Sequence, residues 1–151
     1  MKTVLAAVVA ALFATPALAC PNWQASPSFG QINLNAGFLP DPYVRNITAG
    51  GGYDLAGCFG SNGWGGSVAS APDFDLYWDG SSPALTIGVS ANTDTVLLIN
   101  APDGQWYYSD DVQGTNPAIT FASPQPGLYD IWIGHYGGGR GVPGQLVITE
   151  R

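Results

Sequence analysis

The sequence has 151 residues, a formal net charge of −7 and a hydrophobic content of 46%. This length and apolar content suffice for one domain with a hydrophobic core. The acidic charge would repel a phosphate backbone, so we expect no nucleic acid partner.

The chain begins with a stretch that is typical of a secretory leader. Residues 1–19, MKTVLAAVVAALFATPALA, place Lys2 before an apolar run over 4–13 and end in small residues before Cys20. The run is too short to span a bilayer, and the small residues match signal peptidase cleavage before Cys20. We expect residues 1–19 to be a signal peptide and the mature protein to be periplasmic or secreted. No later apolar run approaches the roughly 20 residues of a transmembrane helix.

The chain has two cysteines, Cys20 and Cys58. In an oxidising compartment the default expectation is a disulfide between them, which would stabilise the fold by about 4 kcal/mol in the chain-entropy model. The alternative is a lipoprotein with its lipid on Cys20, which would leave Cys58 unpaired. We favour it less, because Ala17 stands where a lipobox usually has Leu.

The rest of the chain has the pattern of an all-β protein, because 21 Gly and 11 Pro interrupt it and no window keeps a helical apolar spacing for two turns. In chain order we expect two short strands at 43–48 and 53–56, followed by strands at 73–78, 84–90, 95–100, 105–110, 118–122, 128–136 and 144–150. This spacing predicts an antiparallel β-sandwich, jelly-roll-like, with about eight strands. The glycine-rich segment 135–144 is predicted to be a mobile connection with Arg140 at its tip.

Two strands show which faces should be buried. In 73–78 every second side chain is apolar, and the alternation predicts one dry face and one wet face. The apolar set is Phe74, Leu76 and Trp78, and the polar set is Asp73, Asp75 and Tyr77. The strand at 95–100 has apolar side chains at both its odd and its even positions, so both of its faces are apolar. This predicts a central strand that is covered on both sides.

Two segments are the most diagnostic of the chain: INAPDGQWYYSDD, 99–111, and GLYDIWIGHY, 127–136. With them, the order of elements from about 73 to 149 resembles the bacterial pre-peptidase C-terminal (PPC) domain. The whole mature chain also resembles small stand-alone exported proteins of alphaproteobacteria, which start at a Cys and carry a segment like GGYDLAGC, 51–58. The resemblance implies a single PPC-like β-sandwich domain over 20–151, with a disulfide-tied lead segment over 20–70 and the core match over 73–149.

The resemblance and the residues both favour a protein that is not an enzyme. PPC domains are usually appended to secreted proteases and do not cleave by themselves. A serine peptidase needs a Ser-His-Asp arrangement, whereas His135 is in phase with core residues and Ser67 lacks the Gly-x-Ser-x-Gly spacing. A glycosidase needs only two carboxylates, and the sequence leaves that possibility open.

Calcium is the cofactor that the sequence favours. Some members of the resembled family bind calcium, and Asp94, Asp110 and Asp111 fall where the Asp-rich turns of that family lie. Carboxylate oxygens are ligands that this hard cation prefers, and Asp73 and Asp75 are further candidates. The alternative is structural, with Asp110 capping a turn and Asp111 solvated.

Aromatic side chains form the candidate ligand surface. Trp106, Tyr108 and Trp132 on a flat sheet face would suit stacking against a glycan or a protein contact. The alternative is that the lead segment covers this face. We therefore expect a non-enzymatic exported accessory or binding module with an unknown protein or glycan partner. A secreted hydrolase, such as a peptidase, and a structural envelope protein are the alternatives.

Overall fold

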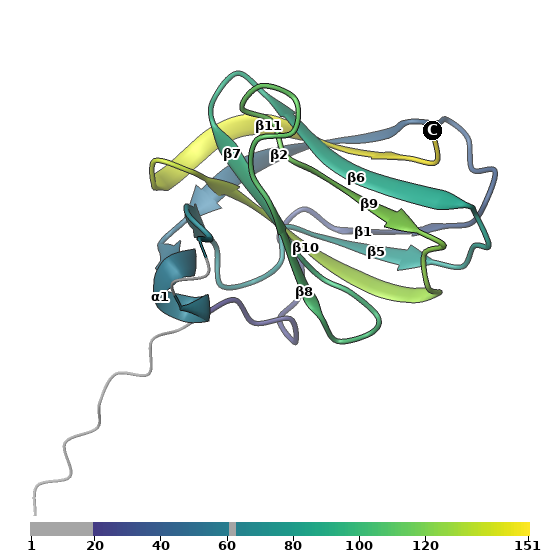
Figure 1. The fold of residues 1–151 in the computed structure, drawn as a ribbon, viewed down its shortest axis with the longest axis horizontal. Coiled ribbons are helices and arrows are strands. Elements are labelled where there is room, and N and C mark those ends of the chain that lie inside the picture. Colours follow the sequence, from purple (N-terminus) through teal and green to yellow (C-terminus); the bar gives the residue numbers. More distant parts are fainter. Residues whose placement is uncertain (1–19, 61–62) are drawn as a thin grey trace, which may run out of the picture.

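Two β-sheets stacked face to face make up most of the structure, a computed structural model that describes residues 20–60 and 63–151 (Figure 1). The predicted leader, 1–19, lies outside the described residues. The seven-stranded sheet contains β1 (Gln31–Leu34), β3 (Tyr53–Asp54), β4 (Ser67–Val68), β5 (Phe74–Trp78), β7 (Thr95–Asn100), β8 (Trp106–Ser109) and β10 (Gly127–His135). The four-stranded sheet contains β2 (Tyr43–Gly51), β6 (Ala84–Ala91), β9 (Ala118–Ala122) and β11 (Gly139–Thr149). The predicted all-β sandwich is confirmed.

The long strand β10 organises the seven-stranded sheet. On one side it pairs with β7, which in turn pairs with β8. On its other side it pairs first with β5 and, beyond a gap, with β4. These pairings are antiparallel, whereas the short strand β1 runs parallel to β5.

Two segments differ from the sequence prediction. The predicted strand at 53–56 is only β3, and α1 (Leu55–Phe59) follows because the Asp54 carboxylate caps it by accepting a hydrogen bond from the Gly57 amide at 2.8 Å. The predicted mobile connection at 135–144 is mostly strand, since β11 begins at Gly139 and pairs with β2 through a bulge between Arg140 and Val142.

The main core fills the space between the two sheets. Alternate side chains of β5, β7 and β10 meet those of β2, β6 and β11, as the apolar period of two requires. Phe74, Leu76 and Trp78 lie in this core, on the face of 73–78 that was predicted to be dry. All six residues of β7 are buried, so the prediction of a central covered strand is confirmed.

A second apolar cluster lies on the outer face of the seven-stranded sheet, which is the face turned away from the four-stranded sheet. It joins Val96, Leu98 and Trp132 of the sheet to Leu55 of α1, with Phe59 and Trp64 packed against it. The predicted disulfide between Cys20 and Cys58 is present and ties α1 to the start of the described chain. We call this region the covered half of the outer face.

Candidate metal centre and the open sheet face

Three aspartates meet at one end of the seven-stranded sheet. Asp94 immediately precedes β7, and Asp110 and Asp111 immediately follow β8. Because β7 and β8 are antiparallel neighbours, the start of one lies beside the end of the other. One carboxylate oxygen from each aspartate lies within 4.8 Å of the others.

The electrostatics of this cluster favour a cation. The Oδ1 atoms of Asp94 and Asp110 are buried without a hydrogen-bond partner. Burial raises the pKa of Asp110 above its usual value, and the charges of Asp111 and Asp94 raise it further. Three carboxylates can supply several of the six to eight oxygen ligands that calcium takes, so the donor set fits this ion.

Asp73 and Asp75, the other two metal candidates, lie outside this cluster. Both side chains are buried, so the prediction that they lie on a solvent-exposed face of their strand is wrong. The Asp73 carboxylate accepts a hydrogen bond from the Ile133 amide at 2.7 Å, in the gap on β10 between its pairings with β5 and β4. This bond satisfies an amide that has no strand partner there, which is a structural role. Burial raises the pKa of Asp73 to about 7.

The candidate aromatic surface is largely covered by the lead segment. Trp132 is fully buried and donates its indole N–H to the Ser70 carbonyl at 3.3 Å. Tyr108 stacks on Trp64 at a centroid distance of 5.3 Å. The prediction of an exposed Trp132 is therefore corrected, because apolar residues of the lead segment pack over it. Trp106 is half-buried at the edge of the covered half.

Beyond that edge, a row of polar side chains crosses the outer face. Asp75 of β5 pairs in register with Asp130 of β10, Asp130 pairs with Asn100 of β7, and Asn100 pairs with Trp106 of β8. Cross-strand partners point to the same face, and Asp130 shares the parity of Trp132. We call Asp75, Asp130, Asn100 and Trp106 the polar row.

Two buried carboxyls stand side by side at the β5 end of the polar row. Asp75 and Asp130 contact each other through a side-chain hydrogen bond, and the Oδ1 atom of each is buried without a partner. Burial raises the pKa of both groups, and the neighbouring Asp75 charge helps to bring that of Asp130 to about 7. The pair therefore binds a proton more readily than two exposed aspartates would.

Sequence reasoning missed Asp130. The signal was an aspartate in an otherwise apolar strand, in phase with Trp132, but its proximity to Asp75 depends on the register between β5 and β10. Asp130 lines a cleft of about 530 Å³, together with Trp23 of the lead segment, Asn100, Trp106 and Leu128. Trp23 is 51% exposed. We call this region the open half of the outer face.

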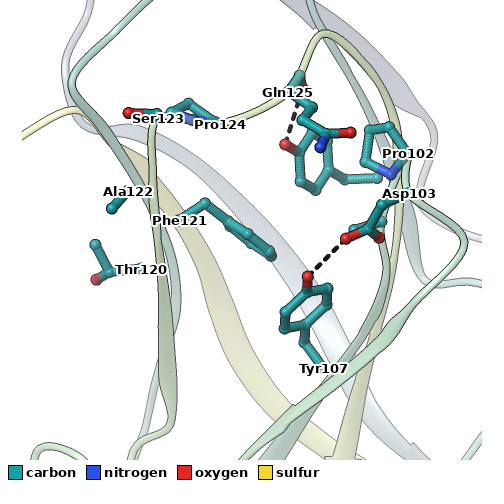
Figure 2. Close-up of a pocket in the computed structure, with 11 residues that line it drawn as sticks. Pro102, Asp103, Tyr107, Thr120, Phe121, Ala122, Ser123, Pro124 and Gln125 are labelled. Atoms are coloured by element: carbon teal, nitrogen blue, oxygen red, sulfur yellow. Dashed lines mark hydrogen bonds between the residues drawn. The ribbon is translucent and has the colours of Figure 1, made fainter.

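A second cleft, of about 270 Å³, lies between the edges of the two sheets, where Tyr107 and Phe121 face each other (Figure 2). The Tyr107 hydroxyl donates to the Asp103 carboxylate at 2.7 Å, and the Tyr129 hydroxyl donates to the Gln125 carbonyl at 2.9 Å. These polar groups are satisfied within the protein. The cleft therefore lacks the unpaired groups that distinguish the open half.

His135 ends β10 opposite Ser67 of β4. Its Nδ1 contacts the carbonyl oxygen of Gly138, so the orienting partner of the ring is a backbone group and not a carboxylate. A Ser-His-Asp triad needs a carboxylate in that position.

Comparisons with known proteins concern the fold. No family model matches the chain, and no curated protein matches its sequence. Among solved structures, the pre-peptidase C-terminal domain of a Bacillus anthracis collagenase is similar at 14% identity and a TM-score of 0.49, over 83% of this chain and 99% of that one. Aeromonas hydrophila PliG, a periplasmic lysozyme inhibitor of g-type lysozyme, is similar at 14% identity and a TM-score of 0.42, over 80% of this chain and 96% of that one.

The PPC domain that the sequence resembles is thus also found among the similar solved structures. At these identities and TM-scores the likeness carries no argument about function, which has to be argued from the residues themselves. Within residues 20–60 and 63–151, no helix is long and apolar enough to cross a membrane.

Proposed function

We propose that this chain is an exported, non-enzymatic binding module that takes up calcium at Asp94, Asp110 and Asp111. The leader-like sequence and the Cys20–Cys58 disulfide support export, because disulfides persist in oxidising compartments. The observation that carries the calcium assignment is the meeting of three carboxylates, two of them with a buried and unpartnered oxygen.

A bound cation would act on the fold at this point. It would remove the repulsion between the carboxylates and hold the segment before β7 against the segment after β8. Because the ion binds the assembled cluster and not the unfolded chain, it stabilises the native state by mass action. The role of the ion is therefore to fix one end of the sandwich.

Thermal unfolding of the mature protein in excess calcium and in chelator tests this proposal. We expect calcium to add about 2 kcal/mol of stability and to raise Tm by about 5 °C. Asp94→Asn, Asp110→Asn and Asp111→Asn should each reduce the rise, whereas the control Asp79→Asn, at an exposed site outside the cluster, should keep it. An equal Tm with calcium and chelator would refute the calcium assignment.

The alternatives have their own tests. Cleavage of casein by the purified protein, lost in His135→Ala, would favour a hydrolase. Isolation of the protein in a stable envelope assembly without any small ligand would favour a structural role.

A further inference from the structure

The open half of the outer face carries negative charge that the described chain does not neutralise. Asp75 and Asp130 are 6% and 3% exposed, and each keeps a buried oxygen without a hydrogen-bond partner. Among the described side chains, the ion pair that the structure contains joins Arg151 to Asp41 at 3.2 Å, and Arg45 lies on β2 of the other sheet. The two carboxyls are hydrogen-bonded to each other, but a buried carboxylate charge that no cation neutralises is costly, so a cation from outside would complete this site.

The surroundings of the two carboxyls indicate what kind of cation would fit. Trp23 is exposed and lines the same cleft as Asp130, and so does Trp106, whose half-buried ring also packs against Phe59 and Trp132. Indole rings attract cations over their faces. The cleft volume of about 530 Å³ is that of a site for an organic group and is far larger than a metal ion needs. A guanidinium group can also donate two parallel hydrogen bonds to one carboxylate.

We propose that the cleft bounded by Trp23, Trp106 and Asp130 binds the guanidinium or ammonium group of an arginine or lysine side chain presented by a partner protein. The net charge of −7 favours approach of a basic partner surface. In the complex, the cation lies against the indole rings and pairs with the Asp130 carboxyl, which lines the cleft and is itself hydrogen-bonded to Asp75. This inference deepens the proposed binding role, and it uses a site that shares no residue with the calcium cluster.

Titration of the protein with capped arginine, followed by the indole N–H resonances of Trp23 and Trp106, tests the proposal. We expect both resonances to shift with capped arginine and capped lysine, and not with capped citrulline, which has the same shape but no charge. Asp130→Asn should weaken arginine binding at least about tenfold, and Asp79→Asn should not change it. Equal shifts with citrulline, or unchanged affinity in Asp130→Asn, would overturn the proposal.

Titrations with other ligands distinguish a protein partner from a small cation and from a glycan. A short peptide with one central arginine should bind more tightly than a free diamine, and the reverse order would overturn the assignment to a protein partner. Saturable binding of a neutral oligosaccharide in place of arginine would overturn the cation assignment. Since Asp130 is buried, Trp23→Ala serves as a second variant at an exposed position, and it should also weaken binding.

All titrations are run with calcium and again with chelator. Arginine binding that persists in both conditions supports this inference even if the calcium cluster fails its own test. A calcium-dependent Tm without arginine binding would keep the calcium assignment and overturn the cleft.

Discussion

The covered half and the open half of the outer face lie on the same strands and have opposite chemistry. On β10, Trp132 is sealed beneath the lead segment, whereas Asp130, two residues earlier and on the same face, borders an open cleft. On β7, Leu98 and Asn100 repeat this division. The boundary between the halves therefore crosses neighbouring strands at the same level.

The difference shows how this sandwich separates stability from binding. Apolar side chains on the covered half are buried by α1 and Trp64, so they stabilise the fold. The polar row is also largely buried, but its carboxyls lower stability while they lack a cation. We therefore expect changes in the covered half to act on unfolding, and changes in the polar row to act mainly on binding and on pH dependence.

Removing the disulfide should have the largest effect on the covered half. In Cys20→Ser with Cys58→Ser, the free energy of unfolding should fall by about 4 kcal/mol, because the unfolded chain regains the freedom of a long loop. Urea unfolding followed by circular dichroism measures the change. A loss below about 1 kcal/mol would mean that the lead segment is held by its packing alone.

A matched pair of substitutions on β10 contrasts the halves directly. Trp132→Ala should cost about 3 kcal/mol because it leaves a cavity under the lead segment. Leu128→Ala, on the same face of the same strand but at the open cleft, should cost less than about 1 kcal/mol. Similar losses in the two variants, measured by urea unfolding, would contradict the division into halves.

The smallest effect should be a pH dependence that comes from the polar row. The pKa of Asp130 is about 7 in the folded protein, against 3.8 as the ordinary value. A folded pKa above the unfolded one means that the contribution of Asp130 is fully present below pH 3.8 and is lost as the pH rises through 7. The Asp130→Asn variant cannot ionise at this position and so does not lose this stability. Above about pH 8 we expect the variant to be more stable than the native protein by about 2 kcal/mol, and at low pH we expect little difference between the two.

Unfolding measured across this pH range provides the check. Asp79→Asn is the control, because it changes an exposed carboxyl outside the polar row. A stability difference between Asp130→Asn and the native protein that stays constant with pH would contradict the burial of an ionisable pair.

Much of the fold is predictable from local sequence patterns. The alternation in 73–78 and the apolar run in 95–100 indicate the faces and the central position of β5 and β7, because side chains of a strand alternate with a period of two. The strand β1 escapes prediction, since its four residues gain a strand's hydrogen bonds only from parallel pairing with β5. The first part of β11 escapes for a similar reason, because its glycines form strand only where β2 pairs with them.

The candidate sites are predictable in unequal measure. Asp94, Asp110 and Asp111 flank two strands that are joined by a tight hairpin, so their meeting follows from short-range pairing. Asp75 and Asp130 meet only through the register of strands that are far apart in the sequence. The cover over Trp132 depends on a helix and a loop that a strand pattern cannot place.

The most direct test of this account is a two-step NMR titration of the mature protein, with calcium first and capped arginine second. We expect calcium to shift the backbone amides of Asp94, Asp110 and Asp111, and arginine then to shift the indole N–H groups of Trp23 and Trp106. Absence of both sets of shifts would contradict the assignment of this chain as a calcium-stabilised binding module.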